Sequence, residues 1–527
     1  MSVKESEIVE LLPAQRDLRI STRRTPLDER AFDAHDAAIV ICSSETAPQT
    51  LRRLPYGATL ERHYNRQARR QSCVSLLSTH VGPQSIPCVL AFVRANASTF
   101  DQLSLGARAW KALATDAPRR ILIGVANLDS EKHASALESF LAAVLAGSAD
   151  LPTLKSKRQP PAAVEAITLC SETADIDISR AIALDRGNHV ARWLTTLPPN
   201  VLDSASYRRA VATLARRHRW GFTFFNVSAL RRLGAGAFLA VARANDHDGA
   251  GIVRLVRRAR DRKTVRGRIA LVGKGICFDT GGINLKPHKA MYQMHEDMQG
   301  SAVALGTLLA LSELDAPFDI DCWLAITENN IGPRAYRPQE VVTAANGVTI
   351  QVIHSDAEGR MALADTLVLA AREKPDAILD FATLTGACVM ALTDRYSGVF
   401  TNRPDWHSML EAAGRASGER VWPFPMDEDF DADLESTIAD VLQCTIDSKG
   451  DHILAARFLN RFVPAETPWI HVDLAASNRR GGLAHIPTEF TGFGVRFAVN
   501  LLLDQALLGS TRRRKAGTVR RGRRRQR

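Results

Sequence analysis

The sequence predicts an α/β fold with two domains: a larger C-terminal domain built on a mostly parallel sheet flanked by helices, and a smaller N-terminal α/β domain. Three observations lead to this prediction. The chain has 527 residues, which is more than one ordinary core accommodates. Short apolar runs typical of buried strands alternate with helical patterns along both halves. A polar stretch at residues 148–161, which contains three prolines, interrupts this alternation as a surface loop or linker would.

The N-terminal part contains three apolar runs that predict buried strands and one clear helical pattern. The helical pattern covers residues 131–146, places its leucines on one face and stops at Gly147. A second helical stretch, residues 182–197, ends at a pair of prolines, and we expect the domain boundary near residue 180. The predicted strands are residues 37–42, 86–93 and 121–126.

The C-terminal part repeats the alternation, which favours a sheet covered by helices on both faces. Its last helical pattern, residues 497–508, would close the domain. We therefore expect an N-terminal domain at residues 1–180, a larger, catalytic domain at residues 181–508 and a basic, disordered tail at residues 509–527. The predicted strands are residues 268–272, 320–326, 348–353, 377–381 and 469–474, and the predicted helices between them are residues 302–314 and 361–372.

The composition is typical of a folded protein, with 45% hydrophobic and 24% charged residues. No window approaches about 18 consecutive apolar residues, so we expect no transmembrane helix and no membrane partner. The eight cysteines include no CxxC pair and lie mostly among apolar neighbours, as the reduced thiols of an intracellular protein would. The N-terminus lacks the apolar run of a signal peptide and is rich in acidic residues. We expect a cytoplasmic location, with nuclear or organellar alternatives left open.

The positive charge of the chain is concentrated at its C-terminal end. Residues 510–527 contain nine Arg, one Lys and no Asp or Glu, so they carry nearly all of the net charge of +11. The rest of the chain is close to neutral. The simplest interpretation is a solvated tail, and the alternatives are a nuclear address or a contact with nucleic acid.

Two segments concentrate residues that can carry out chemistry. The first, residues 272–298, holds glycines at positions 273, 275, 281 and 282, which permit tight turns. The second, residues 354–360, reads His-Ser-Asp-Ala-Glu-Gly-Arg. Both follow predicted strands, and ligands of open α/β sheets bind at the carboxyl ends of strands, so we expect the segments to converge. The reactive residues are Lys274, Asp279, Lys286 and Asp297 in the first segment and Asp356, Glu358 and Arg360 in the second.

Four of these residues are carboxylates that would together bring a charge of −4 into one cleft. Such close like charges cannot all ionise without compensation, and two divalent cations would supply it. Oxygen ligands suit Zn, Mn or Mg, and two ions about 3.5–4 Å apart can activate a bridging water and polarise a carbonyl. Lys274 could act as a neutral amine ligand, because metal charge depresses a lysine pKa. Lys286 and Arg360 would remain cationic and stabilise an oxyanion.

Each segment also has an ordinary structural interpretation. A glycine-rich loop after a strand can be a simple turn, and carboxylates at strand ends can cap helices or remain on the surface. Three histidines, His288, His295 and His354, lie nearby in the sequence and compete as metal ligands. The sequence contains neither the HExxH motif of thermolysin-like zinc sites nor a GxxxxGK[ST] phosphate loop.

Taken together, the two segments resemble the signatures of the leucyl aminopeptidase family of dinuclear metallopeptidases, called M17. The run Asp-Ala-Glu-Gly-Arg at residues 356–360 is highly specific to that family, and the first segment matches in order and spacing through Asp297. The resemblance covers roughly residues 180–500, and the N-terminal part fits the family's smaller domain only loosely. Further similar segments are residues 197–200, 328–329, 335–338, 382–387 and 491–496.

The resemblance implies a role for each metal-binding residue. Asp279 and Glu358 would bridge the two metal ions. Lys274 and Asp297 would complete the shell of one ion, and Asp356 would bind the other. The protein would then be a metal-dependent aminopeptidase that removes N-terminal residues from peptides with a bridging water.

The resemblance also implies how a peptide would be bound and cleaved. Lys286 would polarise the scissile carbonyl, and Arg360 would hold a bicarbonate ion that acts as general base. The free α-amine of the substrate would bind one metal ion, and the family assembles as a hexamer. The residues that would line the side-chain pocket are Met294, Thr383, Gly386, Ala475 and Asn478.

Three features depart from the family pattern. Gln299 stands where a small residue is usual, and Asn478 stands where an apolar residue is common, which puts a preference for leucine in doubt. The arginine-rich tail is not a usual family feature. A second hypothesis follows: the chain is a nucleic-acid-binding or scaffold protein that retained the fold and uses its basic tail. All seven reactive positions are occupied by competent residues, and this favours the enzyme.

Overall fold

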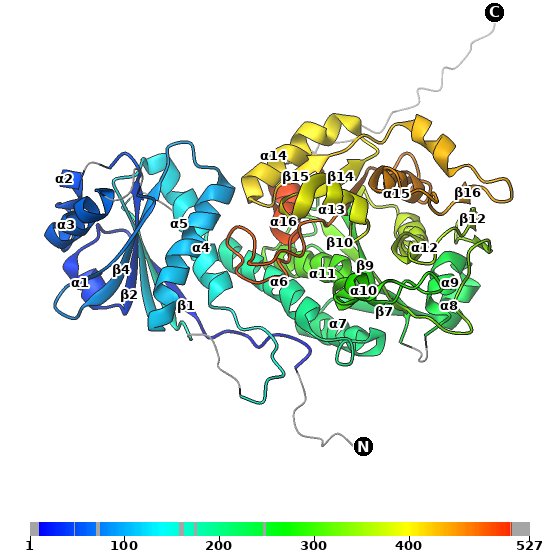
Figure 1. The fold of residues 1–527 in the computed structure, drawn as a ribbon, viewed down its shortest axis with the longest axis horizontal. Coiled ribbons are helices and arrows are strands. Elements are labelled where there is room, and N and C mark those ends of the chain that lie inside the picture. The colour runs from blue at the N-terminus through cyan, green and yellow to red at the C-terminus, as the bar shows by residue number, and fades with distance from the viewer. Residues whose placement is uncertain are drawn as a thin grey trace, which may run out of the picture.

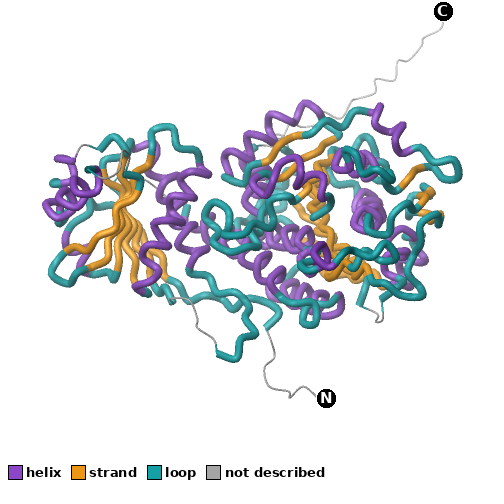
Figure 2. Tube along the Cα trace, in the orientation of Figure 1, coloured by secondary structure: helices purple, strands orange, loops and turns teal. Residues whose placement is uncertain are grey.

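The protein folds into two α/β units, each built around its own sheet (Figure 1). The computed structural model describes residues 10–46, 48–69, 74–157, 163–172, 177–245, 249–505 and 507–508. In both units the strands form the interior and helices lie outside them (Figure 2). The predicted α/β class with two domains is confirmed.

The N-terminal unit contains a six-stranded sheet in the order β1-β6-β5-β2-β4-β3. All neighbouring strands in it are parallel except β3 and β4. Central strands are continuous apolar runs because helices cover both faces of a parallel sheet. The strands are β1 (Arg19–Arg23), β2 (Ala37–Ser43), β3 (Leu76–Val81), β4 (Ile86–Val93), β5 (Arg120–Ala126) and β6 (Ala166–Cys170).

Helices cover both faces of the N-terminal sheet. On one face, α4 (Thr99–Leu113) and α5 (Ser130–Gly147) form a core with the inward side chains of β2 and β5. On the other face lie three short helices, α1 (Glu29–Asp33), α2 (Pro48–Leu51) and α3 (Gly57–Ala68). The helix predicted at residues 131–146 corresponds to α5, and Gly147 is its last residue.

The C-terminal unit is built on an eight-stranded mixed sheet in the order β15-β14-β17-β13-β9-β10-β8-β7. Its central strands β17, β13, β9 and β10 run parallel to one another, and antiparallel pairs occur toward both edges. The strands are β7 (Gly221–Asn226), β8 (Gly251–Arg257), β9 (Arg268–Asp279), β10 (Asp319–Asn329), β13 (Ala377–Ala382), β14 (Ser397–Thr401), β15 (Val421–Pro423) and β17 (Trp469–Asp473).

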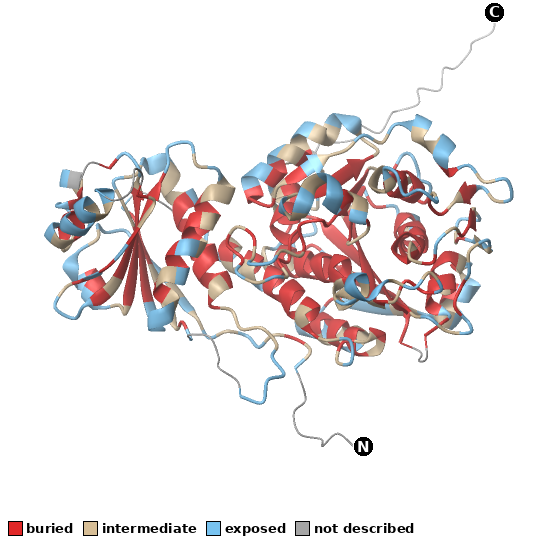
Figure 3. Ribbon diagram, in the orientation of Figure 1, coloured by how far each residue is buried: buried red, intermediate tan, exposed pale blue. Residues whose placement is uncertain are grey.

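Two layers of helices bury this sheet, whose central strands β9, β10, β13 and β17 are almost wholly buried, whereas the edge strand β7 is largely exposed (Figure 3). Each layer forms a separate hydrophobic core with one face of the sheet. The first layer consists of α6 (Ile178–Thr196), α7 (Ser204–His218), α11 (Gln299–Glu313), α14 (His407–Ser417) and α16 (Val495–Asp504). The second consists of α8 (Val227–Arg232), α9 (Gly236–Ala242), α12 (Glu358–Arg372) and α15 (Asp451–Asn460).

The structure corrects three details of the sequence analysis. The strand expected at residues 348–353 is shorter, β12 (Thr349–Gln351), and belongs to a separate three-stranded sheet with β11 (Val341–Thr343) and β16 (Val441–Leu442). The helix expected at residues 497–508 is α16 and ends at Asp504. The strand expected at residues 268–272 continues to Asp279 as β9. The basic tail, residues 509–527, and residues 158–161 of the expected linker lie outside the described residues.

The two units contact each other through helices and ion pairs. α5 packs against α6, Arg16 pairs with Asp185 at 3.4 Å, and Arg496 pairs with Glu138 at 3.4 Å. The seven cysteines that the structure describes are buried free thiols. Within the described ranges, we find no helix that is both long and apolar enough to cross a membrane.

Candidate metal centre

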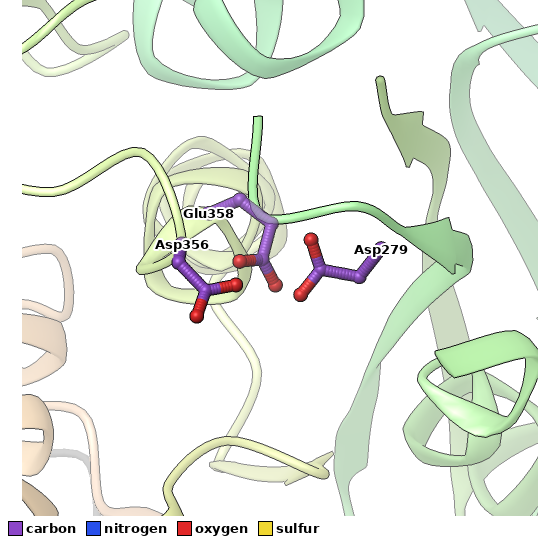
Figure 4. Close-up of side chains that lie close together, drawn as sticks. All are labelled: Asp279, Asp356 and Glu358. Atoms are coloured by element: carbon purple, nitrogen blue, oxygen red, sulfur yellow. The ribbon is translucent and has the colours of Figure 1, made fainter. Parts of the chain in front are cut away.

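Three carboxylates from distant parts of the chain meet at the carboxyl end of β9. Each of Asp279, Asp356 and Glu358 offers an oxygen, and these oxygens lie within 4.8 Å of one another (Figure 4). Asp279 is the last residue of β9, and Glu358 is the first residue of α12. Asp356 lies in the connection that leads from β12 into α12. The two segments therefore converge as expected, although only the first follows a strand of the main sheet.

The glycine-rich turn after β9 holds the Asp279 carboxylate in place. Gly281 and Gly282 have φ values of 85° and 64°, which are readily adopted only by glycine. The Gly281 amide donates to Asp279 Oδ1 at 2.8 Å, and Asn329 Nδ2 donates to the same oxygen at 2.8 Å. Ser355 Oγ donates to the Gly281 carbonyl at 2.7 Å and so ties this turn to the Asp356 segment.

Two lysines interleave with the carboxylates. Lys274 Nζ lies 2.7 Å from Asp297 Oδ1 and 2.9 Å from Glu358 Oε1. Its side chain passes directly beside Gly359, where a Cβ would approach Nζ to 2.7 Å. Lys286 Nζ lies 3.0 Å from Asp279 Oδ2 and also pairs with Asp356. The expected cluster of four carboxylates and two lysines is thus assembled in one place.

Burial and mutual repulsion dominate the electrostatics of this cluster. Burial raises the pKa of Asp279 well above its usual range, and the charges of Glu358 and Asp297 raise it further. Burial raises the pKa of Asp297 to about 7. Burial would also raise the pKa of Glu358, but Lys274 and Lys286 hold it below its ordinary value.

The lysines carry the compensating charge in this structure. Burial alone would lower the pKa of Lys274 and of Lys286, but the surrounding carboxylates raise both above their ordinary values. When all four carboxylates are ionised, as ligands of a metal ion are, the two ammonium groups balance only half of their negative charge. Asp297 Oδ2 is also buried without a hydrogen-bond partner among the described residues. An oxygen-rich, under-compensated cluster of this kind fits divalent cations.

Arg360 lies beside this cluster but is directed to a different carboxylate. Its Nη2 lies 2.8 Å from both Oδ1 and Oδ2 of Asp451, and its Nη1 donates to the Gln443 carbonyl at 3.1 Å. The guanidinium is almost wholly buried. The guanidinium on which the resemblance places a bicarbonate ion is therefore paired with the carboxylate of Asp451. The sequence analysis missed Asp451, which belongs to neither motif.

The five expected pocket residues fall on three segments beside the cluster. Thr383 Oγ1 donates to Asp297 Oδ1 at 2.8 Å, so this expected pocket residue contacts the acidic cluster. Gly386 is exposed, and a Cβ there would meet no atom within 4 Å. Asn478 Nδ2 donates to Glu296 Oε2 at 2.7 Å. Ala475 is buried, and Met294 is half-buried in the short helix that precedes Asp297.

Glu296 and Gln299 are polar neighbours of Asn478. Gln299 Nε2 donates to Glu296 Oε2 at 3.1 Å, the oxygen that also accepts from Asn478. The two residues that depart from the family pattern, Gln299 and Asn478, therefore bind one carboxylate between them. The sequence analysis named both as departures but missed Glu296, whose proximity depends on the fold.

The neighbouring histidines do not join the acidic cluster. His288 and His354 are exposed, and His295 packs its ring edge-on against Phe490. In the described part of the chain, the group of close potential metal ligands contains carboxylates alone.

Comparison with known proteins agrees with this geometry. Residues 189–499, more than half of the chain, match the cytosol aminopeptidase family, catalytic domain. A probable cytosol aminopeptidase of Synechococcus sp. (strain CC9605) is 39% identical over 66% of this chain and 71% of that protein. A second, from Parasynechococcus marenigrum (strain WH8102), is 37% identical over 80% of this chain and 87% of that protein.

Two solved structures share the fold over nearly the whole chain. A mutant of tomato leucine aminopeptidase has a TM-score of 0.82 and 25% identity, covering 93% of this chain and 98% of that one. The bottromycin maturation enzyme BotP, in complex with Mn, has a TM-score of 0.76 and 26% identity, covering 90% of this chain and 99% of that one. With its acidic cluster at the end of β9, the chain belongs to the cytosol aminopeptidase family, M17, and is a metal-dependent aminopeptidase.

Proposed function

We propose that the cluster binds two divalent ions, Zn, Mn or Mg, with a defined division of ligands. Asp279 and Glu358 would be shared by the two ions, Lys274 and Asp297 would complete the ligands of one, and Asp356 would bind the other. The observation that carries this proposal is the gathering of the Asp279, Asp356 and Glu358 oxygens within 4.8 Å. The charge that remains uncompensated beside two lysines supports two ions rather than one.

The same residues indicate how hydrolysis would proceed. Two bound ions would polarise the scissile carbonyl and activate a water molecule. Lys286 is the one cation of the cluster that we assign to the substrate: its ammonium donates to the carbonyl oxygen as negative charge develops there. Lys286 now pairs with Asp279 and Asp356, so binding of cations by these carboxylates would release it for this role. The reaction removes the N-terminal residue of a peptide.

The side-chain pocket is proposed to be polar. Asn478, Glu296 and Gln299 form a hydrogen-bonded group next to Asp297, where a purely apolar wall would suit leucine better. A buried polar group left unpaired by an apolar ligand costs binding free energy, whereas a polar side chain can satisfy it. We therefore expect peptides with polar first residues to be preferred over those that begin with leucine.

Assembly, location and domain limits follow as further parts of the proposal. The resemblance supports a homohexamer, which light scattering on a size-exclusion column would test. The relatives named cytosol aminopeptidases support a cytoplasmic location. We propose the domain limits 1–180 and 181–508, since α6 packs chiefly on α11 of the larger unit.

A panel of aminoacyl substrates with Mn, Zn and Mg tests the enzymatic proposal. Substrates with a free α-amine should be hydrolysed, and the same substrates with an acetylated amine should not. Equal rates on both would show that the enzyme is not restricted to N-terminal residues. Asp405→Ala, a change at an exposed surface carboxylate, serves as a control beside Asp356→Ala.

A second candidate function, nucleic-acid binding, is favoured by one observation: the ten basic residues within positions 510–527. These residues lie outside the described part of the chain. Binding of duplex DNA or RNA should fall steeply with salt, through counterion release. Deleting residues 510–527 should abolish that binding and leave peptidase rates within about twofold. Equal affinity of both forms would move the nucleic-acid site onto the folded body.

A further inference from the structure

The pair formed by Arg360 and Asp451 is unusual in its position. Arg360 is the third residue of α12, which begins with the metal-centre residue Glu358. Asp451 is the first residue of α15, and both of its oxygens lie 2.8 Å from Arg360 Nη2. Two helices thus meet through one ion pair beside the acidic cluster.

Arg360 is well buried, whereas Asp451 reaches toward solvent. The Arg360 side chain is 3% exposed and that of Asp451 is 19% exposed. A guanidinium stays charged in proteins, so Arg360 is a buried cation that the Asp451 carboxylate balances. Burying a charged pair is costly and does not by itself stabilise a fold. A role of the Arg360–Asp451 pair in the chemistry of the neighbouring cluster would explain why the pair is buried.

The chemistry of Asp451 matches that of the anion expected on Arg360. Bicarbonate and a carboxylate are both planar oxyanions that accept hydrogen bonds from a guanidinium. An ionised carboxylate has about four lone-pair positions, and the contact with one guanidinium nitrogen leaves positions for a proton. The side chain is also partly accessible, as a group that exchanges protons with a substrate must be.

We propose that Asp451 is a built-in replacement for bicarbonate: its carboxylate occupies the anion position on Arg360 and serves as the general base of hydrolysis. The inference rests on the proposed aminopeptidase function. As the oxygen of the attacking water bonds to the carbonyl carbon, a proton of that water passes to Asp451. When the C–N bond breaks, Asp451 returns the proton to the departing amine nitrogen. The carboxylate is regenerated, and no external anion is consumed.

A purely structural role for Asp451 makes different predictions. An acidic residue in the first turn of a helix interacts favourably with the helix dipole, and Asp451 is in that position in α15. The same helix carries a second pair, in which Arg457 Nε lies 2.8 Å from Asp431 Oδ1 and Nη2 lies 2.6 Å from Oδ2. Asp431→Ala is therefore a matched control that removes an Arg–Asp pair of α15 without touching Arg360.

Anion binding is the first test, and it does not depend on turnover. The full chain loaded with Mn is titrated with bicarbonate, and binding is followed by calorimetry. We expect no binding to wild type or to Asp431→Ala, and binding to Asp451→Ala, whose Arg360 lacks its carboxylate. Binding of bicarbonate to wild type as tight as to Asp451→Ala would overturn the proposal.

Rates in buffer freed of carbon dioxide form the second test. General base catalysis contributes on the order of 100- to 10,000-fold, so Asp451→Ala should lose about that much. Added bicarbonate or formate should restore part of the rate of Asp451→Ala. Asp451→Asn should be equally slow but not restored, because its amide still fills the position. Wild type and Asp431→Ala should not respond to either anion.

Three outcomes contradict the proposal. They are stimulation of wild type by bicarbonate, an Asp451→Ala rate close to wild type, and an Asp451→Ala loss that neither anion restores. Melting temperature and metal content, measured on each variant, identify a variant that fails to fold. If Asp451→Ala fails to fold, the slow rate expected of Asp451→Asn becomes the test, and an Asp451→Asn rate close to wild type would contradict the proposal. If no substrate is hydrolysed by wild type, the proposed function fails, whereas the binding difference still decides whether Asp451 occupies the anion position.

Discussion

The two sheets of this protein have related architectures but differ in whether the charged side chains at their strand ends are exposed or buried. In the N-terminal sheet, the charged residues at strand ends form exposed pairs, such as Arg119 with Glu165 and Arg120 with Asp36. In the C-terminal sheet, β9 carries Lys274 and ends in Asp279, and both are almost wholly buried, at 3% and 2% exposure. The N-terminal strands thus serve packing, whereas β9 also builds a site.

The difference has an energetic meaning. Removing charges from water costs several kcal/mol per ion even after the protein relaxes, so a fold gains little stability by burying them. The N-terminal unit largely avoids that cost, whereas the C-terminal unit accepts it at several positions, among them the cluster around Lys274. Carboxylates held there with strongly shifted pKa values, such as Asp279 and Asp297, are typical of functional sites.

Chelation should produce the largest effect and test this contrast directly. Removal of divalent ions should abolish hydrolysis, because no ion would remain to polarise the carbonyl and activate water. At ion concentrations of about 100 times Kd, bound ions add about 2.7 kcal/mol per site to stability, so the C-terminal unit should also unfold more easily. Hydrogen exchange of the two sheets, with and without chelator, is the measurement. Undiminished hydrolysis in fully demetallated protein would contradict the prediction.

Two substitutions within the cluster should separate catalysis from metal binding. Lys286→Ala should lower the rate on the order of 100- to 1000-fold, the typical loss for one oxyanion donor, while the metal content stays unchanged. Asp356→Ala should instead weaken metal binding. Rates and metal content of both variants are measured together. A collapse of metal content in Lys286→Ala would assign Lys286 to the metal ions instead of the carbonyl oxygen.

The sequence predicted the fold and the cluster well because both depend on local patterns. The boundaries of β4 agree with the predicted strand, since an apolar run bounded by turn residues defines its own ends. The meeting of Asp279 with Glu358 followed from two motifs at strand and helix ends. Such patterns indicate which residues are buried, and the buried faces determine how helices and sheets pack into layers.

The features that the sequence analysis missed depend on contacts between residues far apart in the chain, which local sequence patterns do not reveal. Asp451 reaches Arg360 across 91 positions of the chain, and its own surroundings form no motif. The placement of β12 in a small separate sheet, paired with β11 and β16, also depends on long-range pairing. Strand propensity indicates that residues 349–351 are extended but does not identify their partners.

Asn478→Met should have a smaller effect than the two substitutions within the cluster, and the effect should be mainly on substrate specificity. It removes the hydrogen bond to Glu296 and makes the pocket wall apolar. Differences of this size in a pocket are worth about 1–3 kcal/mol, so the ratio of kcat/KM for leucyl over polar substrates should rise about tenfold or more. Gln293→Ala, which removes the longer contact of 3.3 Å to Asn478, is the milder control. An unchanged ratio would place Asn478 outside the substrate pocket.

The smallest effect is expected at the exposed charges of the N-terminal sheet. Glu165 pairs with Arg119, but their side chains remain 41% and 66% exposed, so water screens the pair and little charge is desolvated. Glu165→Ala should therefore change the free energy of unfolding by no more than about 0.5 kcal/mol and leave hydrolysis unaffected. Denaturant unfolding and peptidase rates provide the two measurements. A loss above about 2 kcal/mol, or a slower reaction, would mean that charge in the N-terminal sheet also has a structural or catalytic role, and the contrast between the two sheets would fail.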